Sequence, residues 1–343
     1  MRSRGIVLTT VGVLLGVALL WWVATQYAQD SQSSVTLLNV SYDPTRELWK
    51  EVNQAFTRQY EQETGVRLRI KQSHGGSGSQ ARAVIDGLEA DVVTLALHSD
   101  TDEIRKRGLL ADGWEGRLPH DSLPYYSTIV FVVRQGNPKG IKDWPDLVRG
   151  DVRIITPNPK TSGNGKLTFL AAWGYVRHNG GSEPEAEAFV TDLYRRVPVL
   201  DTAARAATVT FAKKHIGDVH LTWENEAHLE VEESRGKLEI VYPSSSIRAE
   251  PPVAWVDANV ERKGTHAAAE AYLRFLYTDQ GQEIIAKHHY RPINPDVLDR
   301  HADRLRPLHL FPVTLMADNW EDAFQKFFGP GGVFDRIYRA RGQ

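Results

Sequence analysis

From residue 35 onward, short runs of β-branched and aliphatic residues alternate with longer stretches whose apolar side chains recur every three or four positions. The first run, VTLLNVSYDP, precedes a stretch with apolar residues at Leu48, Val52, Ala55 and Phe56. The same unit recurs three times. The four junctions from strand to helix read SYDP, SHGGSG, TPNPKTSGNGK and LDTAARAA. Alternating strands and helices predict an α/β fold with largely parallel sheets.

These four junctions carry the most informative polar residues. Ligands of such sheets bind beyond the carboxyl ends of the strands, where helix N-termini present unpaired N–H groups and partial positive charge. Asp43 is expected to cap its helix, with Pro44 at the first helical position. Helix capping alone would explain any single junction, whereas four such loops together favour a shared anion site.

The N-terminal 34 residues have a different character. Arg2 and Arg4 precede an uncharged apolar run from Ile6 to Val23, and a polar spacer follows. This pattern predicts a hydrophobic helix that is either an export signal or a membrane anchor. As a helix the run would span about 27 Å, close to a hydrocarbon core of about 30 Å. Cleavage stays open, because Gln26 occupies a position where signal peptidase sites prefer a small residue.

Composition removes several classes of function. The 343 residues include 41 Lys and Arg against 43 Asp and Glu, so no basic surface for nucleic acid is expected. The chain has no cysteine, which excludes disulfides and thiolate metal sites. No H-E-x-x-H motif occurs, and the adjacent His288 and His289 are interpreted as surface residues. No metal site is expected. The length suggests two domains or lobes.

One enzymatic alternative lies at the second junction. Gly76, Gly78 and Ala81 match the spacing of a dinucleotide fingerprint, and Asp100 follows at about the distance of a ribose-binding acid. An NAD-dependent enzyme is therefore an alternative. Short glycine patterns are common, and nicotinamide cofactors are not normally available outside the cytoplasm.

Other catalytic motifs fail at single positions. In the P-loop pattern, Leu167 stands where Ser or Thr is needed and Lys160 where the first Gly belongs. The nucleophile elbow fails because Ser79 replaces the last Gly after Ser77. We therefore expect a protein that binds without catalysing a reaction and that needs no cofactor.

Taken together, several segments resemble the sulfate-binding proteins of bacterial ABC importers, which are periplasmic solute receptors closely related to thiosulfate-binding proteins. The resemblance covers nearly the whole chain after Ser34, in the same order and with similar spacing. It rests on LLNVSYDPTRELW, QSHGGSGSQA, EADVVTLAL, STIVFVVRQGNPK, ITPNPKTSGNGK, LAAWGY, GDVHLTWENEA and YLRFLYTDQGQEIIAK.

This resemblance implies a type II periplasmic-binding-protein fold, in which two α/β lobes seal the ligand in the cleft between them. Residues 1–34 would be the signal or anchor with its spacer. The first lobe would comprise residues 35–116 and 247–343, and the second residues 117–246. The two strands that cross between the lobes would lie at or beside residues 127–138 and 246–257.

The resemblance also implies a binding site made of neutral donors. His74 and Arg205 would support the surrounding loops. Asn164 departs from the family, which commonly has Gly at this position. The donors would be the N–H groups of Asp43, Ser77, Gly163, Asn164 and Ala204, the hydroxyl of Ser162 and the indole of Trp223.

The implied function is capture of sulfate in the periplasm and its delivery to an ABC permease. Thiosulfate or another tetrahedral oxyanion is the alternative ligand. A monomer is expected, held at the inner membrane if the N-terminal helix is not cleaved.

Overall fold

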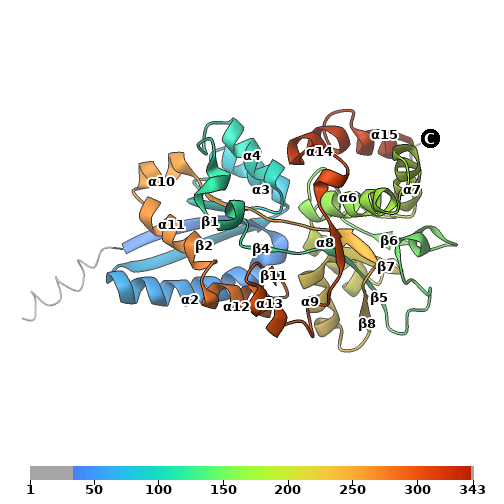
Figure 1. The fold of residues 1–343 in the computed structure, drawn as a ribbon, viewed down its shortest axis with the longest axis horizontal. Helices are drawn as coiled ribbons and strands as arrows, with labels where there is room; N and C mark the ends of the chain where they lie inside the picture. The colour runs from blue at the N-terminus through green and yellow to red at the C-terminus, as the bar shows by residue number, and fades with distance from the viewer. Residues whose placement is uncertain (1–33, 341–343) are drawn as a thin grey trace, which may run out of the picture.

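The computed structural model describes residues 34–340, which form two α/β lobes arranged along the long axis of the molecule (Figure 1). The predicted hydrophobic helix over Ile6–Val23 lies outside the described residues. No helix within residues 34–340 is long and apolar enough to cross a membrane. The α/β class predicted from the alternating pattern is confirmed.

The first lobe is built on a four-stranded sheet with the order β10-β3-β1-β2. β1 (Ser34–Tyr42) pairs in parallel with β2 (Arg67–Gly75) and β3 (Val92–Thr94), and β10 (Val253–Trp255) runs antiparallel at the edge. Leu37 and Val40 of β1 and both valines of β3 are buried because helices cover the sheet. These helices are α2 (Arg46–Thr64), α3 (Ser77–Ile85), α4 (His98–Lys106), α10 (Asp257–Lys263), α11 (His266–Phe275) and α12 (Asp279–Lys287).

Shorter elements complete this lobe. A two-stranded sheet joins β4 (Tyr125–Tyr126) to β11 (Arg291–Pro292), and Tyr125 packs on Tyr290 in the core of the first lobe. The first lobe therefore extends past the expected boundary at residue 116. The remaining short helices are η1 (Asp43–Thr45), η2 (Trp114–Arg117), α5 (Pro119–Ser122) and α13 (Pro295–Arg300).

The second lobe contains a sheet with the order β6-β7-β5-β8. Only β6 (Ile154–Ile155) and β7 (Val219–Trp223) are parallel, whereas β5 (Ile129–Arg134) pairs antiparallel with β7 and β8 (Leu238–Val241). The prediction of largely parallel sheets is therefore wrong for this lobe, because β5 enters from the first lobe and runs against its neighbours. Its helices are η3 (Trp144–Val148), α6 (Gly163–His178), α7 (Glu183–Arg195), α8 (Ala204–Thr208), the π-helical turn η4 (Val209–Lys213) and α9 (Glu224–Ser234).

Within residues 34–340 the chain passes between the lobes three times. Ser127 and Ala249 exchange backbone hydrogen bonds of 2.8 and 2.9 Å where the first two passages run side by side. The third passage leads from α13 to β12 (His309–Phe311), which pairs in parallel with β9 (Ser245–Ile247). The resemblance implies two passages, so the third passage was not expected from the sequence.

The C-terminal segment packs on the second lobe, so the assignment of residues 247–343 to the first lobe is wrong for residues 309–340. η5 (Val313–Leu315), α14 (Trp320–Phe327) and α15 (Val333–Ala340) lie beside α6 and α7 (Figure 1). Phe327 meets the ring of Trp173 with centroids 4.9 Å apart. The aromatic face of α6 needs this cover, because Trp173 would otherwise be exposed to water.

Candidate binding site between the lobes

The structure places most of the expected donors at the first turns of helices. Asp43, Ser77, Gly163 and Ala204 are the first residues of η1, α3, α6 and α8, and Asn164 is the second residue of α6. N–H groups in a first helical turn have no partner within their own helix. They also lie at the positive end of the helix dipole.

Close packing brings two of these helix starts together across the lobe boundary. A Cβ atom built at Gly163 would lie 2.4 Å from Cβ of Ala96 and 3.3 Å from Cβ of Ser77. One built at Gly76 would lie 2.5 Å from the carbonyl oxygen of Thr161. Both positions require glycine because the loops of the two lobes touch there. The start of α3 therefore lies against the start of α6.

The start of η1 also contacts the start of α9, through a pair of aromatic rings and a side-chain hydrogen bond. The rings of Tyr42 and Trp223 lie with their centroids 5.2 Å apart. Asn225 donates its side-chain N–H to the carbonyl oxygen of Pro44 at 2.9 Å. Trp223 is fully buried at the end of β7, and its indole Nε1 has no partner within the described protein. This buried donor is available to a ligand.

Two further expected residues lie at the start of α6. Ser162 caps this helix, and its oxygen accepts from the N–H of Gly165 at 3.4 Å, which leaves the hydroxyl hydrogen free to donate. Asn164 is buried, and its amide nitrogen donates to the carbonyl oxygen of Leu221 at 3.4 Å. The Oδ1 atom of Asn164 has no partner within the described protein. Its carboxamide thus lies between α6 and β7.

Asp43 differs from its expected role as a helix cap, and that prediction is wrong. Tyr42 occupies the cap position without a side-chain cap bond. The Asp43 carboxylate instead accepts from the guanidinium of Arg46 at 2.6 Å. The nearby guanidinium is a charged donor and therefore a stronger partner than a backbone amide.

The two residues expected to support the loops lie beside them. His74 shares a hydrogen bond of 2.6 Å with the hydroxyl of Ser41. Burial, with a smaller contribution from Arg46, lowers the pKa of His74 to about 4, so its ring is neutral at neutral pH.

Arg205 links the two lobes. Its guanidinium donates to Glu47 on α2 at 3.1 and 3.2 Å and to Glu226 on α9 at 3.1 Å. Burial raises the pKa of Glu226 to about 7. Arg205 therefore joins the α8 loop of the second lobe to the first lobe through Glu47.

A buried ion pair across the lobes is the main feature that the sequence did not reveal. Lys166 on α6 pairs with Asp100 on α4, and both side chains are at most 4% exposed. Asp100 also accepts from the hydroxyl of Ser77 at 2.6 Å, and Ser77 accepts from the N–H of Ala96 at 3.0 Å. The pair thus fixes the start of α3. Asp100 is fully engaged here and does not have the open position of a ribose-binding acid.

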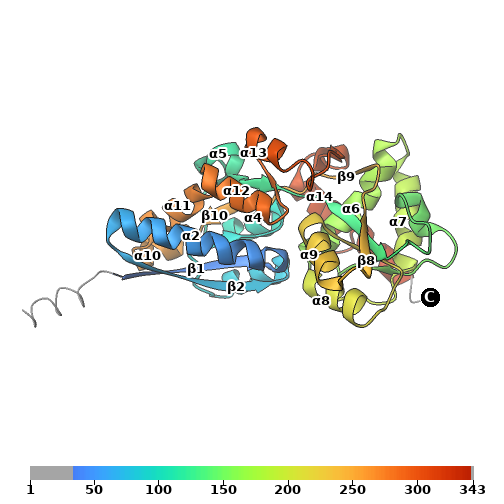
Figure 2. The ribbon, with the colours of Figure 1, turned by 90° about the horizontal axis from the view of Figure 1, so that it is seen from below.

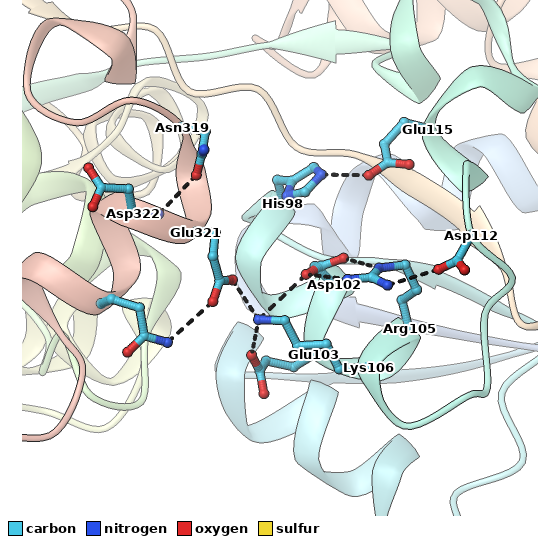
Figure 3. Close-up of polar contacts among 11 residues, drawn as sticks. His98, Asp102, Glu103, Arg105, Lys106, Asp112, Glu115, Asn319, Glu321 and Asp322 are labelled. Atoms are coloured by element: carbon cyan, nitrogen blue, oxygen red, sulfur yellow. Dashed lines mark hydrogen bonds and ion pairs between the residues drawn. The ribbon is translucent and has the colours of Figure 1, made fainter.

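A second cross-lobe contact lies at the surface, between α4 and α14 (Figure 3). Lys106 approaches Asp102 at 3.6 Å, Glu103 at 3.0 Å and Glu321 at 2.5 Å. Glu321 belongs to the C-terminal segment that packs on the second lobe. This cluster is partly exposed, in contrast to the buried pair of Asp100 and Lys166.

Two α/β lobes whose helix starts converge on their shared interface are the architecture of the two-lobed binding proteins. Residues 39–291 match the model of the bacterial extracellular solute-binding proteins. The chain belongs to this family.

Particular relatives are similar over most of their length. The thiosulfate-binding protein of Pseudomonas aeruginosa is 51% identical over 304 residues, which cover 88% of this chain and 92% of that protein. The sulfate-binding protein of Salmonella typhimurium is 52% identical over 305 residues, which cover 88% of this chain and 93% of that protein.

Solved structures agree with the fold. The sulfate-binding protein SubI from Mycobacterium tuberculosis H37Rv superposes with a TM-score of 0.79 at 30% identity, covering 86% of this chain and 99% of that chain. A Bordetella ferric binding protein matches with a TM-score of 0.56 at 14% identity, covering 89% of this chain and 99% of that chain, which supports the fold alone. The predicted two-lobed periplasmic-binding-protein fold is confirmed.

The two cross-lobe lysines should contribute unequally to stability. Lys166→Met leaves Asp100 buried without a counter-charge and should lower the free energy of unfolding by about 3–5 kcal/mol. Lys106→Met removes a partly exposed pair and should cost about 1 kcal/mol or less. Urea unfolding of both variants measures the difference. Equal losses would mean that the buried pair is not the stronger contact.

Proposed function

We propose that this chain captures sulfate between its lobes and delivers it to the membrane permease of an ABC importer. The observation that carries the proposal is the convergence of unpaired helix starts from both lobes, joined by the buried and unpartnered indole of Trp223. The names of the relatives, sulfate-binding and thiosulfate-binding proteins, support an oxyanion as the ligand. One chain supplies both lobes, so a monomer suffices.

The proposed donors are Asp43, Ser77, Gly163, Asn164 and Ala204 through N–H, Ser162 through its hydroxyl and Trp223 through its indole. Each hydrogen bond to a charged partner contributes roughly 1.5–3 kcal/mol. Seven such bonds could offset the large cost of removing a dianion from water without a contacting Lys or Arg. Net affinity falls far below their sum, because lobe closure and desolvation oppose binding.

Binding and release constitute the whole proposed activity, with no chemical step. Thiosulfate is the second candidate ligand, because a thiosulfate-binding protein is among the relatives at about the same identity as the sulfate-binding ones. Calorimetric titration of the described region with sulfate, thiosulfate, molybdate, phosphate and NAD separates these ligands from one another and from the enzymatic alternative.

We also propose that the run from Ile6 to Val23 either directs export or stays as a tether at the outer face of the inner membrane. The membership of the chain in an extracellular solute-binding family supports export. A retained helix would hold the receptor near its permease. Mass spectrometry of the native protein distinguishes the two states, since a mature chain beginning near Gln29 would exclude the tether.

Two substitutions test the donors directly. Ser162→Ala and Trp223→Phe should each weaken sulfate binding by about 1–3 kcal/mol, because a buried anion loses one donor. Trp49→Phe and Ser245→Ala are matched controls. Both side chains are buried, and the indole nitrogen of Trp49 and the hydroxyl of Ser245 lack a hydrogen-bond partner within the described protein but lie outside the proposed donor set. Calorimetry should show wild-type affinity for the controls. Wild-type binding by the two site variants would disprove the assigned donors.

Phosphate should be rejected. It carries at least one proton near neutral pH, and a buried O–H group needs an acceptor, whereas sulfate needs only donors. The Asp43 carboxylate is turned to Arg46. Phosphate should therefore bind more weakly by about 1–3 kcal/mol or more from mildly acidic to mildly basic pH. Competition titrations measure this difference. Comparable affinities would show that an acceptor, either Asp43 or Oδ1 of Asn164, reaches the ligand.

A further inference from the structure

Two histidines stack face to face across the boundary between the lobes. His228 belongs to α9 of the second lobe, and His289 follows α12 in the first lobe. Their ring centroids lie 4.0 Å apart with an interplanar angle of 9°. Glu224 at the start of α9 accepts two hydrogen bonds from Arg291 of β11, so α9 lies beside β11 at this boundary. His289, interpreted from the sequence as a surface residue, is half-buried, because α9 covers part of its ring.

His228 lies among polar and positively charged side chains. Its Nε2 atom lies 3.1 Å from the hydroxyl of Tyr242. Positive charge comes from Arg291 on β11 and from Arg304 and Arg306 on the third passage. Among the carboxylates near these groups, Glu224 is occupied by two hydrogen bonds of 2.7 and 2.8 Å from Arg291. Glu232 on α9 and Glu47 on α2 line the adjoining cavity, and Glu47 accepts from Arg205.

His289 is surrounded in a similar way. His288 pairs with Glu51 at 2.9 Å, and His301 pairs with Glu283 at 2.9 Å, so these two carboxylates are occupied. Arg304 adds positive charge. Glu232 on α9 lines the adjoining cavity of about 200 Å³ together with the residues 287–290. The Nδ1 atom of His289 is buried without a partner within the described protein.

Burial and the nearby arginines keep both imidazole rings neutral while the lobes are in contact. Burial, together with the nearby arginines, lowers the pKa of His228 to about 4. Burial, followed by the repulsion that a protonated His228 would exert, lowers the pKa of His289 to about 3. A ring that is released into water has an ordinary pKa near 6.5. Separated lobes therefore bind protons more readily than closed lobes.

We propose that the stack of His228 on His289 is a pH-sensitive contact that favours closed lobes near neutral pH and opens them on acidification. The inference rests on the proposed function, because closure of the lobes is measured through the affinity for the bound anion. The direction follows from linkage: closure is fully favoured above pH 6.5 and is lost as the pH falls from 6.5 toward 4. Each ring that protonates only when the lobes open weakens binding by about tenfold per pH unit in this range.

Two other groups near the site also titrate, namely His74 and Glu226. A comparison at matched pH removes their contribution, because the variants below keep both. Sulfate itself stays a dianion from pH 7.5 to 5.0, so the ligand adds no titration of its own.

The test compares sulfate affinity at pH 7.5 and 5.0 in the wild type and in the His228→Phe/His289→Phe variant, which keeps two stacked rings that cannot be protonated. Calorimetry should show a loss of affinity on acidification at least tenfold larger in the wild type than in the double variant. Each single variant should fall between them. His266→Phe, a substitution of an exposed histidine on α11, should behave as the wild type. Thermal melts at pH 5.0 establish that each variant is folded.

A second readout follows the lobes themselves. The chain contains no cysteine, so Gln62→Cys on α2 and Lys214→Cys after η4 place one thiol on each lobe for a pair of fluorescent dyes. With sulfate near half-saturation at pH 7.5, acidification should separate the dyes in the wild-type background and much less in the double variant.

The outcomes separate the two proposals. Binding of sulfate at pH 7.5 with the same pH dependence in the wild type and the double variant would overturn the histidine contact and leave the proposed function intact. Failure of the wild type to bind sulfate or thiosulfate at pH 7.5 would contradict the proposed function.

Discussion

Helix starts from two lobes meet at a buried interface, where their unpaired N–H groups need an acceptor. An unpaired buried donor costs free energy. Within the described residues, the starts of α3 and α6 touch so closely that Gly76 and Gly163 admit no side chain. A small anion between the lobes would satisfy these donors together. The same contact therefore explains both the need for a ligand and the need for closure.

The contacts around this interface differ in strength. The pair of Asp100 and Lys166 is buried and holds the hydroxyl of Ser77, so it ties the start of α3 to α6. The cluster around Lys106 is partly exposed and more readily screened by salt. The stacked rings of His228 and His289 add a contact whose strength depends on protonation. Three contacts therefore hold the lobes together: a buried ion pair, a partly exposed ionic cluster and a pair of stacked histidines.

The local features could be predicted from the sequence, because they depend on residues close together in the chain. The α3 start within SHGGSG and the α6 start within TPNPKTSGNGK follow from turn residues and apolar periodicity. The two lobes and the individual donors came from the family resemblance. The fold is confirmed by comparison, whereas the donor set stays a prediction.

The features that were not predicted correctly from the sequence depend mostly on contacts between residues that are distant in the chain. Asp100 and Lys166 are 66 positions apart, and neither has a local signal that marks the other. The cap assigned to Asp43 failed because Arg46 competes for the carboxylate. The direction of β5 and the packing of residues 309–340 on the second lobe are set by how the chain passes between the lobes. Local periodicity does not encode that path.

A crystal structure of the protein with sulfate is the most direct test of an anion site between the lobes. We expect one anion between the lobes, within hydrogen-bond distance of N–H groups from both Ser77 and Gly163 and of the Trp223 indole, with no Lys or Arg side chain in contact. An anion held by a lysine or arginine, or bound to one lobe alone, would contradict it.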